Sequence, residues 1–69
     1  MKVYIVHECN YNYSSHYILG VYSSREKAVA ALMEEFDDLI YDERDEEWEH
    51  ANRYLNSDYY YISVYTLDE

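Results

Sequence analysis

Residues Glu34–Glu49, which decide the fold, read EEFDDLIYDERDEEWE. Ten of them are acidic and one, Arg44, is basic, so the stretch has a formal charge of −9 (1 minus 10), against −10 (5 minus 15) for the whole chain. The remaining residues hold five acids and four bases and are nearly neutral. The charge asymmetry is therefore local, and it lies where apolar residues recur at helical spacing.

Working outward towards the N-terminus, we expect the helix to start at Ser23. Ser23 and Glu26 form a capping box, in which the serine accepts from a first-turn amide and the glutamate reaches back. Lys27 to Ile40 contains neither glycine nor proline. Its apolar residues lie within about 60° of one line at 100° per residue. These are Val29, Leu32, Met33, Phe36, Leu39 and Ile40. The pattern predicts an amphipathic helix that packs on a sheet and has an acidic outer face.

A second apolar stripe follows, rotated by roughly 90° from the first. Its members are Tyr41, Trp48, Ala51 and Leu55. One straight helix from residue 24 to residue 56 would be about 50 Å long at 1.5 Å per residue. A domain of this length is only about 30 Å across. We therefore expect a break near Tyr41–Glu43, with Asp42 as a possible N-cap, and a second helix over about Glu43–Leu55.

Three other segments have the composition of strands: Val3–His7, His16–Tyr22 and Tyr59–Leu67. Gly20, the only glycine, lies inside the second and indicates a bulge or a close packing contact. The order of elements is then β-β-α-α-β. We expect one α+β domain over residues 1–69, a three-stranded antiparallel sheet with one or two helices packed on one face. The first strand should be central, and the edge at the second strand should be open.

Length and composition limit the class of protein. A 69-residue chain has a small core, and Cys9, the only cysteine, cannot form an intrachain disulfide. Self-association through the sheet would bury more apolar surface than this small core does alone, so a homodimer is one expectation. No segment is long enough to span a membrane, the N-terminus is too polar for a signal peptide, and the cytoplasm is the expected compartment. The acidic balance argues against direct contact with nucleic acid or with an anionic membrane.

The first half of the chain also resembles a known kind of protein. After Met1–Val6 comes Gly20-Val21-Tyr22-Ser23-Ser24-Arg25-Glu26-Lys27-Ala28, a strand that leads into a helix. This pattern is similar to small uncharacterised accessory domains of bacteriophages and mobile elements, of ββαβ type. The resemblance implies a small phage-type accessory protein, which would act in the host cytoplasm. It brings no catalytic residues with it.

The acidic stretch supplies the leading functional hypothesis. Duplex DNA presents about one negative charge per 1.7 Å of axis, and carboxylates on a helical face approach that density. Small inhibitors of CRISPR and restriction systems often resemble this chain in size and charge. We therefore expect a non-enzymatic inhibitor, such as an anti-CRISPR protein, that meets a basic nucleic-acid-binding protein and competes with DNA or RNA. The expected contact residues are Glu34, Glu35, Asp37, Asp38, Asp42, Glu43, Asp45, Glu46, Glu47 and Glu49. The alternative is a solvated, solubilising surface.

The eleven tyrosines support a second hypothesis. Tyr11 and Tyr13 alternate with asparagine and serine, a composition typical of binding loops, and both are added to the expected contact residues. The alternative function is a small dimeric accessory domain that binds a protein or a small ligand through its tyrosine-rich loop and sheet.

The sequence gives less support to metal binding or catalysis. The acidic stretch lacks the glycine of a calcium-binding EF-hand loop. His7, Cys9 and His16 would meet if the first two strands paired, but a zinc site needs a fourth ligand. Glu47 and His50 echo a di-metal helical motif without its other ligands. We expect no metal, no cofactor and no enzymatic activity.

Overall fold

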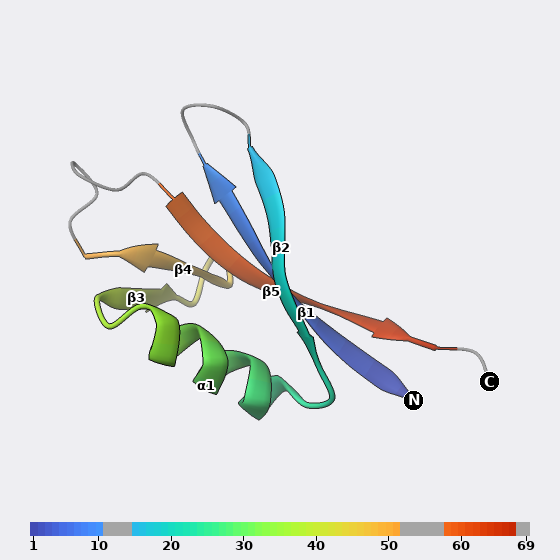
Figure 1. Cartoon of the computed structure of the whole chain (residues 1–69). Coiled ribbons are helices and arrows are strands. Elements are labelled where there is room, and N and C mark those ends of the chain that lie inside the picture. Colours follow the sequence, from blue (N-terminus) through green and yellow to red (C-terminus); the bar gives the residue numbers. More distant parts are fainter. Residues whose placement is uncertain (11–14, 52–57, 68–69) are drawn as a thin grey trace.

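The computed structural model of the protein describes residues 1–10, 15–51 and 58–67. Its elements, in chain order, are β1 (Lys2–Asn10), β2 (His16–Tyr22), α1 (Arg25–Glu35), β3 (Leu39–Asp42), β4 (Glu47–His50) and β5 (Asp58–Thr66). The strands form one twisted antiparallel sheet in the order β2-β1-β5-β4-β3 (Figure 1). The expected three-stranded sheet with one or two helices is therefore wrong, since the described residues form five strands and one short helix.

The part of the sheet nearest the N-terminus has the arrangement that the sequence predicts. β1 pairs with β2 on one side and with β5 on the other, so it lies inside the sheet and β2 is an edge. Val6 pairs with Gly20 and His7 with Ile18, which leaves Leu19 as the extra residue of a bulge beside the glycine. A Cβ at Gly20 would lie 2.7 Å from the hydroxyl of Tyr22. Both expectations for Gly20 are confirmed.

The start of α1 differs from the prediction by one residue. The N-cap is Ser24, whose Oγ accepts from the backbone N–H of Lys27 at 3.2 Å. Ser23 lies outside the helix and its hydroxyl lies 3.3 Å from the Lys27 ammonium. The capping box expected from Ser23 and Glu26 is wrong, because the third helical position after Ser24 is a lysine.

The end of α1 comes earlier than the apolar periodicity predicts. The N–H of Phe36 still bonds the carbonyl of Leu32 at 3.0 Å, but Phe36 itself is extended, with φ −129°. The last turn contains no basic residue, and Glu34, Glu35 and Asp37 lie at the negative end of the helix dipole, where carboxylates are unfavourable. The carboxylates therefore disfavour a further helical turn at a point where the sequence has no glycine or proline.

A β-hairpin stands where the sequence predicted the end of the first helix and a second helix. β3 pairs with β4 in the register Leu39 with His50 and Tyr41 with Trp48, so alternate residues face the core. Of the second stripe, Tyr41 therefore lies on β3 and Trp48 on β4, whereas Ala51 follows β4 and is exposed. Leu55 lies outside the described residues. Asp42 caps a turn and not a helix, since its Oδ1 accepts from the N–H of Arg44 at 2.9 Å.

The core lies between α1 and one face of the sheet. Its buried members come from four elements and are Val6, Ala28, Leu32, Trp48 and Tyr60. Arg25, at the start of α1, holds its guanidinium carbon 5.5 Å from the centre of the Trp48 ring, and Tyr41 covers the same indole at 4.6 Å between ring centres. The hairpin therefore completes a core that α1 and three strands alone would leave open.

Three polar side chains fix the hairpin to the rest of the sheet. The Nδ1 of His50 lies 2.9 Å from the carboxylate of Asp38, and its Nε2 lies 2.9 Å from the hydroxyl of Tyr60. His50 is 5% exposed and Tyr60 1%. Nδ1–H donates to the carboxylate, and the Tyr60 hydroxyl then donates to Nε2, so both ring nitrogens are satisfied.

Removal of the Tyr60 hydroxyl tests this connection. Tyr60→Phe leaves Nε2 of His50 without its partner inside the protein, so we expect the free energy of unfolding to fall by about 1–3 kcal/mol. Tyr65→Phe is the matched control, because Tyr65 is 55% exposed and its change should stay within about 0.5 kcal/mol. Urea unfolding of both variants makes the comparison, and equal effects would contradict the role of the hydroxyl.

Candidate functional site

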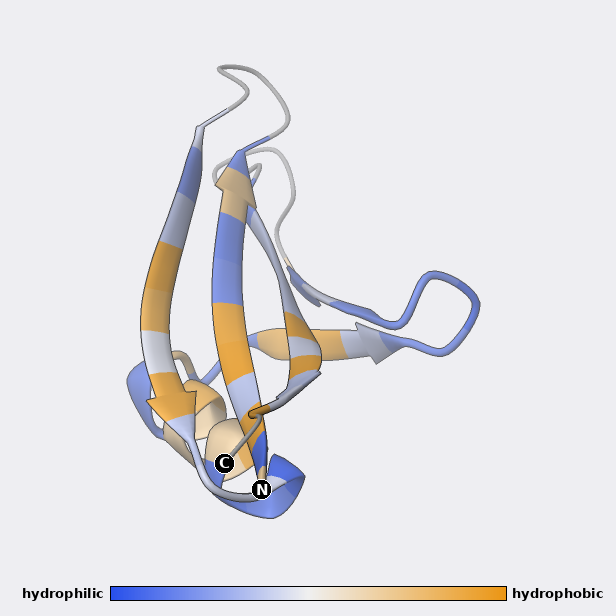
Figure 2. Cartoon of the chain, turned by 90° about the vertical axis from the view of Figure 1, so that its right-hand side faces the viewer, coloured by the Kyte–Doolittle hydropathy of each residue, from blue (hydrophilic) through white to orange (hydrophobic). Residues whose placement is uncertain are grey.

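The expected acidic contact residues lie on three consecutive parts of the fold and not on one helix. Glu34 and Glu35 are in the last turn of α1, and Asp37 and Asp38 lie in the link to β3. The others belong to the hairpin: Asp42 ends β3, then Glu43, Asp45 and Glu46 form the turn, and Glu47 and Glu49 lie on β4. The turn is the most hydrophilic projection in Figure 2. The acidic surface is therefore centred on a β-hairpin.

Asp38 and Asp42 each accept a hydrogen bond within the chain. Asp38 accepts from the buried His50, and Asp42 accepts from the backbone of Arg44. The Arg44 side chain is 92% exposed and its Nε lies 3.9 Å from Asp42, which is a weak surface contact. Asp38 and Asp42 thus have structural tasks, and the carboxylates of the turn are better placed to meet a partner.

A surface hollow of about 270 Å³ lies beside the turn. It is lined by carboxylate residues of the hairpin and by residues of β5, namely Asp45, Glu46, Glu47, Tyr59, Tyr61 and Ile62. We call these six residues the acidic hollow. Carboxylates pair with guanidinium and ammonium groups, and tyrosine rings attract the same cations through their faces. The arrangement suits the side chain of an arginine or a lysine.

The backbone at Glu46 is strained. Glu46 has φ +55°, and it is the only non-glycine residue with positive φ in the described part of the chain. This left-handed conformation costs an ordinary residue roughly 1–2 kcal/mol and is usually taken by glycine or asparagine. Strained residues are found at functional sites more often than elsewhere. A glutamate therefore stands at the rim of the hollow where stability alone would favour glycine.

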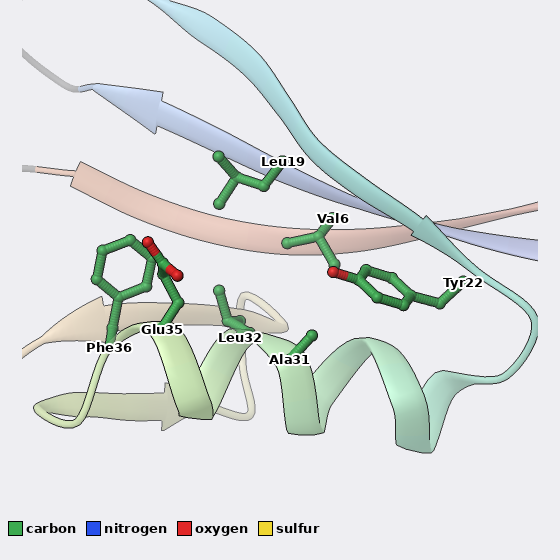
Figure 3. A pocket seen from close by; sticks show the side chains of 7 residues that line it. All are labelled: Val6, Leu19, Tyr22, Ala31, Leu32, Glu35 and Phe36. Carbon is green, nitrogen blue, oxygen red and sulfur yellow. The ribbon is translucent and has the colours of Figure 1, made fainter.

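A second cavity, of about 190 Å³, lies between α1 and the β1–β2 pair (Figure 3). Apolar side chains such as Leu19 and Leu32 line it, with Glu35 and the Tyr22 hydroxyl as its polar groups. Ligand pockets for small molecules usually measure about 300–1,000 Å³. The cavity is smaller than that range and has few polar groups to orient a ligand.

The face of the sheet opposite α1 carries a histidine cluster. Nδ1 of His7 lies 2.7 Å from Nε2 of His16, and Nε2 of His7 lies 2.6 Å from the hydroxyl of Ser63. The Tyr61 ring stacks on His7 with 4.4 Å between ring centres. Burial lowers the pKa of His7 below its ordinary 6.5, and the nearby His16 lowers it further. The two histidines do meet, as the pairing of their strands predicted.

Cys9 does not turn this cluster into a metal site. It pairs with His16 across the ladder and with Tyr59 on β5, and a hydrogen bond with its thiol is the main cause that raises the pKa of Tyr59. In residues 1–10, 15–51 and 58–67, no group of three or more His, Cys, Asp or Glu side chains is placed to hold a metal ion. Glu47 and His50 lie three apart on a strand, so they point to opposite faces and not along one helix side.

Sequence reasoning missed the β5 side of the acidic hollow. Tyr59 and Tyr61 are two residues apart on a predicted strand, so a shared face was foreseeable. Their position beside Glu47 was not foreseeable, because the apolar periodicity predicted a helix at Glu47. Tyr11 and Tyr13, the two loop residues expected to make contact, lie outside the described residues.

A protein-family model matches the chain. The family model described as "Domain of unknown function (DUF7336)" matches residues 1–69, the full length of the chain. The chain belongs to the DUF7336 family. No curated protein matches it, and no solved structure matches it. In the described part of this DUF7336 chain, no helix is long and apolar enough to cross a membrane.

We expect the histidine cluster to make stability depend on pH. His7 of the unfolded chain titrates near 6.5 and folded His7 titrates lower, so the unfolded state binds more protons in this window. We expect the free energy of unfolding to fall as the pH falls below about 6.5, down to the folded pKa. His7→Gln should flatten this slope. His16→Gln should flatten it only in part, because burial, the larger cause, remains. Urea titrations from pH 7.5 to pH 5 measure the slopes, and an unchanged slope in His7→Gln would exclude this origin.

The strain at Glu46 gives a second expectation for the DUF7336 domain. Glu46→Gly should raise the free energy of unfolding by about 1 kcal/mol, because glycine adopts positive φ without steric cost. Glu43→Gly removes the same charge from the same turn at a residue without positive φ, and should bring no such gain. Thermal and urea unfolding compare the two variants. Equal gains would show that charge relief, and not backbone strain, is responsible.

Proposed function

We propose that the protein is a non-enzymatic inhibitor that places its acidic hairpin on the basic surface of a nucleic-acid-binding protein and so competes with DNA or RNA. The acidic hollow is the observation that carries the proposal. It brings three carboxylate residues of the hairpin together with the rings of Tyr59 and Tyr61. A groove that binds phosphates is lined by arginine and lysine, and these are the side chains that the hollow suits.

The distribution of charge supports the same partner. Glu43, Asp45 and Glu46 are exposed on a turn that projects from the sheet, so a partner can reach them without unfolding the domain. Charges of one sign on such a projection speed the encounter with a basic surface and disfavour acidic partners. A solubilising surface requires neither the tyrosine rings beside the carboxylates nor a strained glutamate at the rim.

The biological setting belongs to the proposal as well. A small acidic inhibitor of this kind suits a phage or mobile-element protein that blocks a host defence complex in the cytoplasm, and anti-CRISPR activity is the specific form we propose. The support is the strand-to-helix resemblance of residues 20–28 together with the acidic hollow. The hollow also defines the contact more narrowly than the ten acidic residues do.

The test begins with a minimal probe, a short oligoarginine peptide. Neutralising the three acids of the hollow (Asp45→Asn, Glu46→Gln and Glu47→Gln together) should weaken binding by about tenfold or more, at up to about 1 kcal/mol for each exposed pair. The matched control neutralises Glu34, Glu35 and Asp37 and so removes the same charge. It should weaken binding much less. Isothermal titration calorimetry at low salt measures both.

A second stage tests competition. The chain immobilised at low salt should capture nucleic-acid-binding proteins from a host lysate and release them at high salt, because exposed charges are screened. With a captured protein purified, the wild type should displace labelled DNA or RNA from it, and the hollow variant should not. Displacement that is equal for the hollow variant and the control variant would overturn the assignment of the hollow, and salt-insensitive binding would overturn an electrostatic mechanism.

A further inference from the structure

The sheet has two edges, and they differ in chemistry. In the part of the chain that the structure describes, no strand pairs with the outer side of β2 or of β3. β2 has seven residues, none of them Asp, Glu, Lys or Arg. Its exposed side chains are mostly apolar: Tyr17, Ile18, Leu19 and Val21. An edge strand of this composition exposes backbone donors and acceptors to any strand that can approach it.

The β3 edge is protected against such pairing. β3 has only four residues and ends at Asp42, and Asp37, Asp38 and Glu43 flank it in the sequence. A second copy that approached this edge would bring two segments of formal charge −9 together. Short length and charge are the usual means by which edge strands avoid pairing. β2 is neither short nor charged. Its one irregularity is the bulge at Leu19, and the ladder with β1 continues on both sides of the bulge.

We propose that two copies of this chain associate edge to edge through β2, so that their sheets continue across the dimer. The strands would run antiparallel about a twofold axis, an arrangement in which the same surface serves both partners. Backbone hydrogen bonds along β2 would provide the pairing, as in other cases where a strand adds to an open edge.

Charge placement favours a second copy as the occupant. The order β2-β1-β5-β4-β3 puts the acidic hairpin at the edge opposite β2, and Figure 2 shows the hydrophilic turn and β2 on opposite sides of the molecule. Pairing at β2 therefore keeps the two acidic surfaces as far apart as the sheet allows. It also leaves both acidic hollows uncovered by the partner copy, so the dimer would present two copies of the surface in the proposed function.

Apolar side chains on β2 also favour a second copy of the chain as the partner. Ile18 and Val21 pair with His7 and Ile5 of β1, so they lie on the face opposite α1, where they are 61% and 57% exposed. Tyr17 and Leu19, on the other face, are 61% and 43% exposed. A partner strand along β2 would cover part of each group, which is the burial that a 69-residue chain lacks on its own.

One pair of substitutions separates the two edges. Ile18→Lys places a charge on β2, and Ile40→Lys makes the same change on β3, at 61% and 60% exposure. Sedimentation equilibrium should give the wild type and Ile40→Lys a mass of twice 8.4 kDa at high micromolar concentration, and Ile18→Lys the monomer mass. Val21→Lys repeats the test if Ile18→Lys does not fold. A monomeric wild type, or a dimeric Ile18→Lys variant, would overturn the proposal.

Two further measurements identify the mode of association. Hydrogen exchange should show amides of β2 that become protected as concentration rises, whereas docking through the faces of two sheets would leave β2 amides unchanged and would overturn edge pairing. Self-association should strengthen as salt is added, because repulsion between two chains of charge −10 is screened. Binding to oligoarginine should weaken under the same change. The opposite salt dependences keep a failure of this proposal separate from a failure of the proposed function.

Discussion

The hydrogen bonds that join Asp38, His50 and Tyr60 are the constraint on which the rest of the structure depends. They connect the link after α1, the end of β4 and the third residue of β5, which faces the core. The backbone adds a bond from the N–H of Ala51 to the carbonyl of Asp38, at 2.9 Å. Because both ends of the hairpin are held there, Trp48 is kept in the core and the acidic turn is directed outward. The positions of the carboxylates thus follow from one buried histidine.

Much of the sheet could be predicted from the sequence. Val3–His7 and His16–Tyr22 are rich in β-branched and aromatic residues, and the polar segment between them left antiparallel pairing as the simple arrangement. Gly20 indicated the bulge, because a glycine inside a strand often marks a bulge or a close packing contact. These features depend on local composition, which a sequence displays directly.

The region from Phe36 to His50 could not be predicted by the same reasoning. Glutamate, leucine and arginine favour helices, and Phe36, Leu39 and Ile40 continue a helical stripe. Strands of four residues offer only two inward positions each, too few to establish an alternating pattern against that stripe. Tertiary contacts decide the outcome: Phe36 packs against Tyr60 at 4.7 Å between ring centres, and Asp38 accepts a hydrogen bond from His50. The one local signal was the row of carboxylates at the helix end, where the dipole disfavours them.

The acidic residues fall into groups whose presence has different physical explanations, and this difference bears on function. Asp38 and Asp42 accept hydrogen bonds within the chain. Asp37 and Glu43, together with these two, keep the short β3 edge from pairing with other strands. Edge protection does not account for Asp45 or Glu46, which lie in the turn beyond β3 and line a hollow with two tyrosines of β5. Glu46 also holds a backbone conformation that glycine would adopt more easily. Structural needs therefore account for the acids around β3 and leave Asp45 and Glu46 unexplained, which supports the hollow as the proposed contact surface.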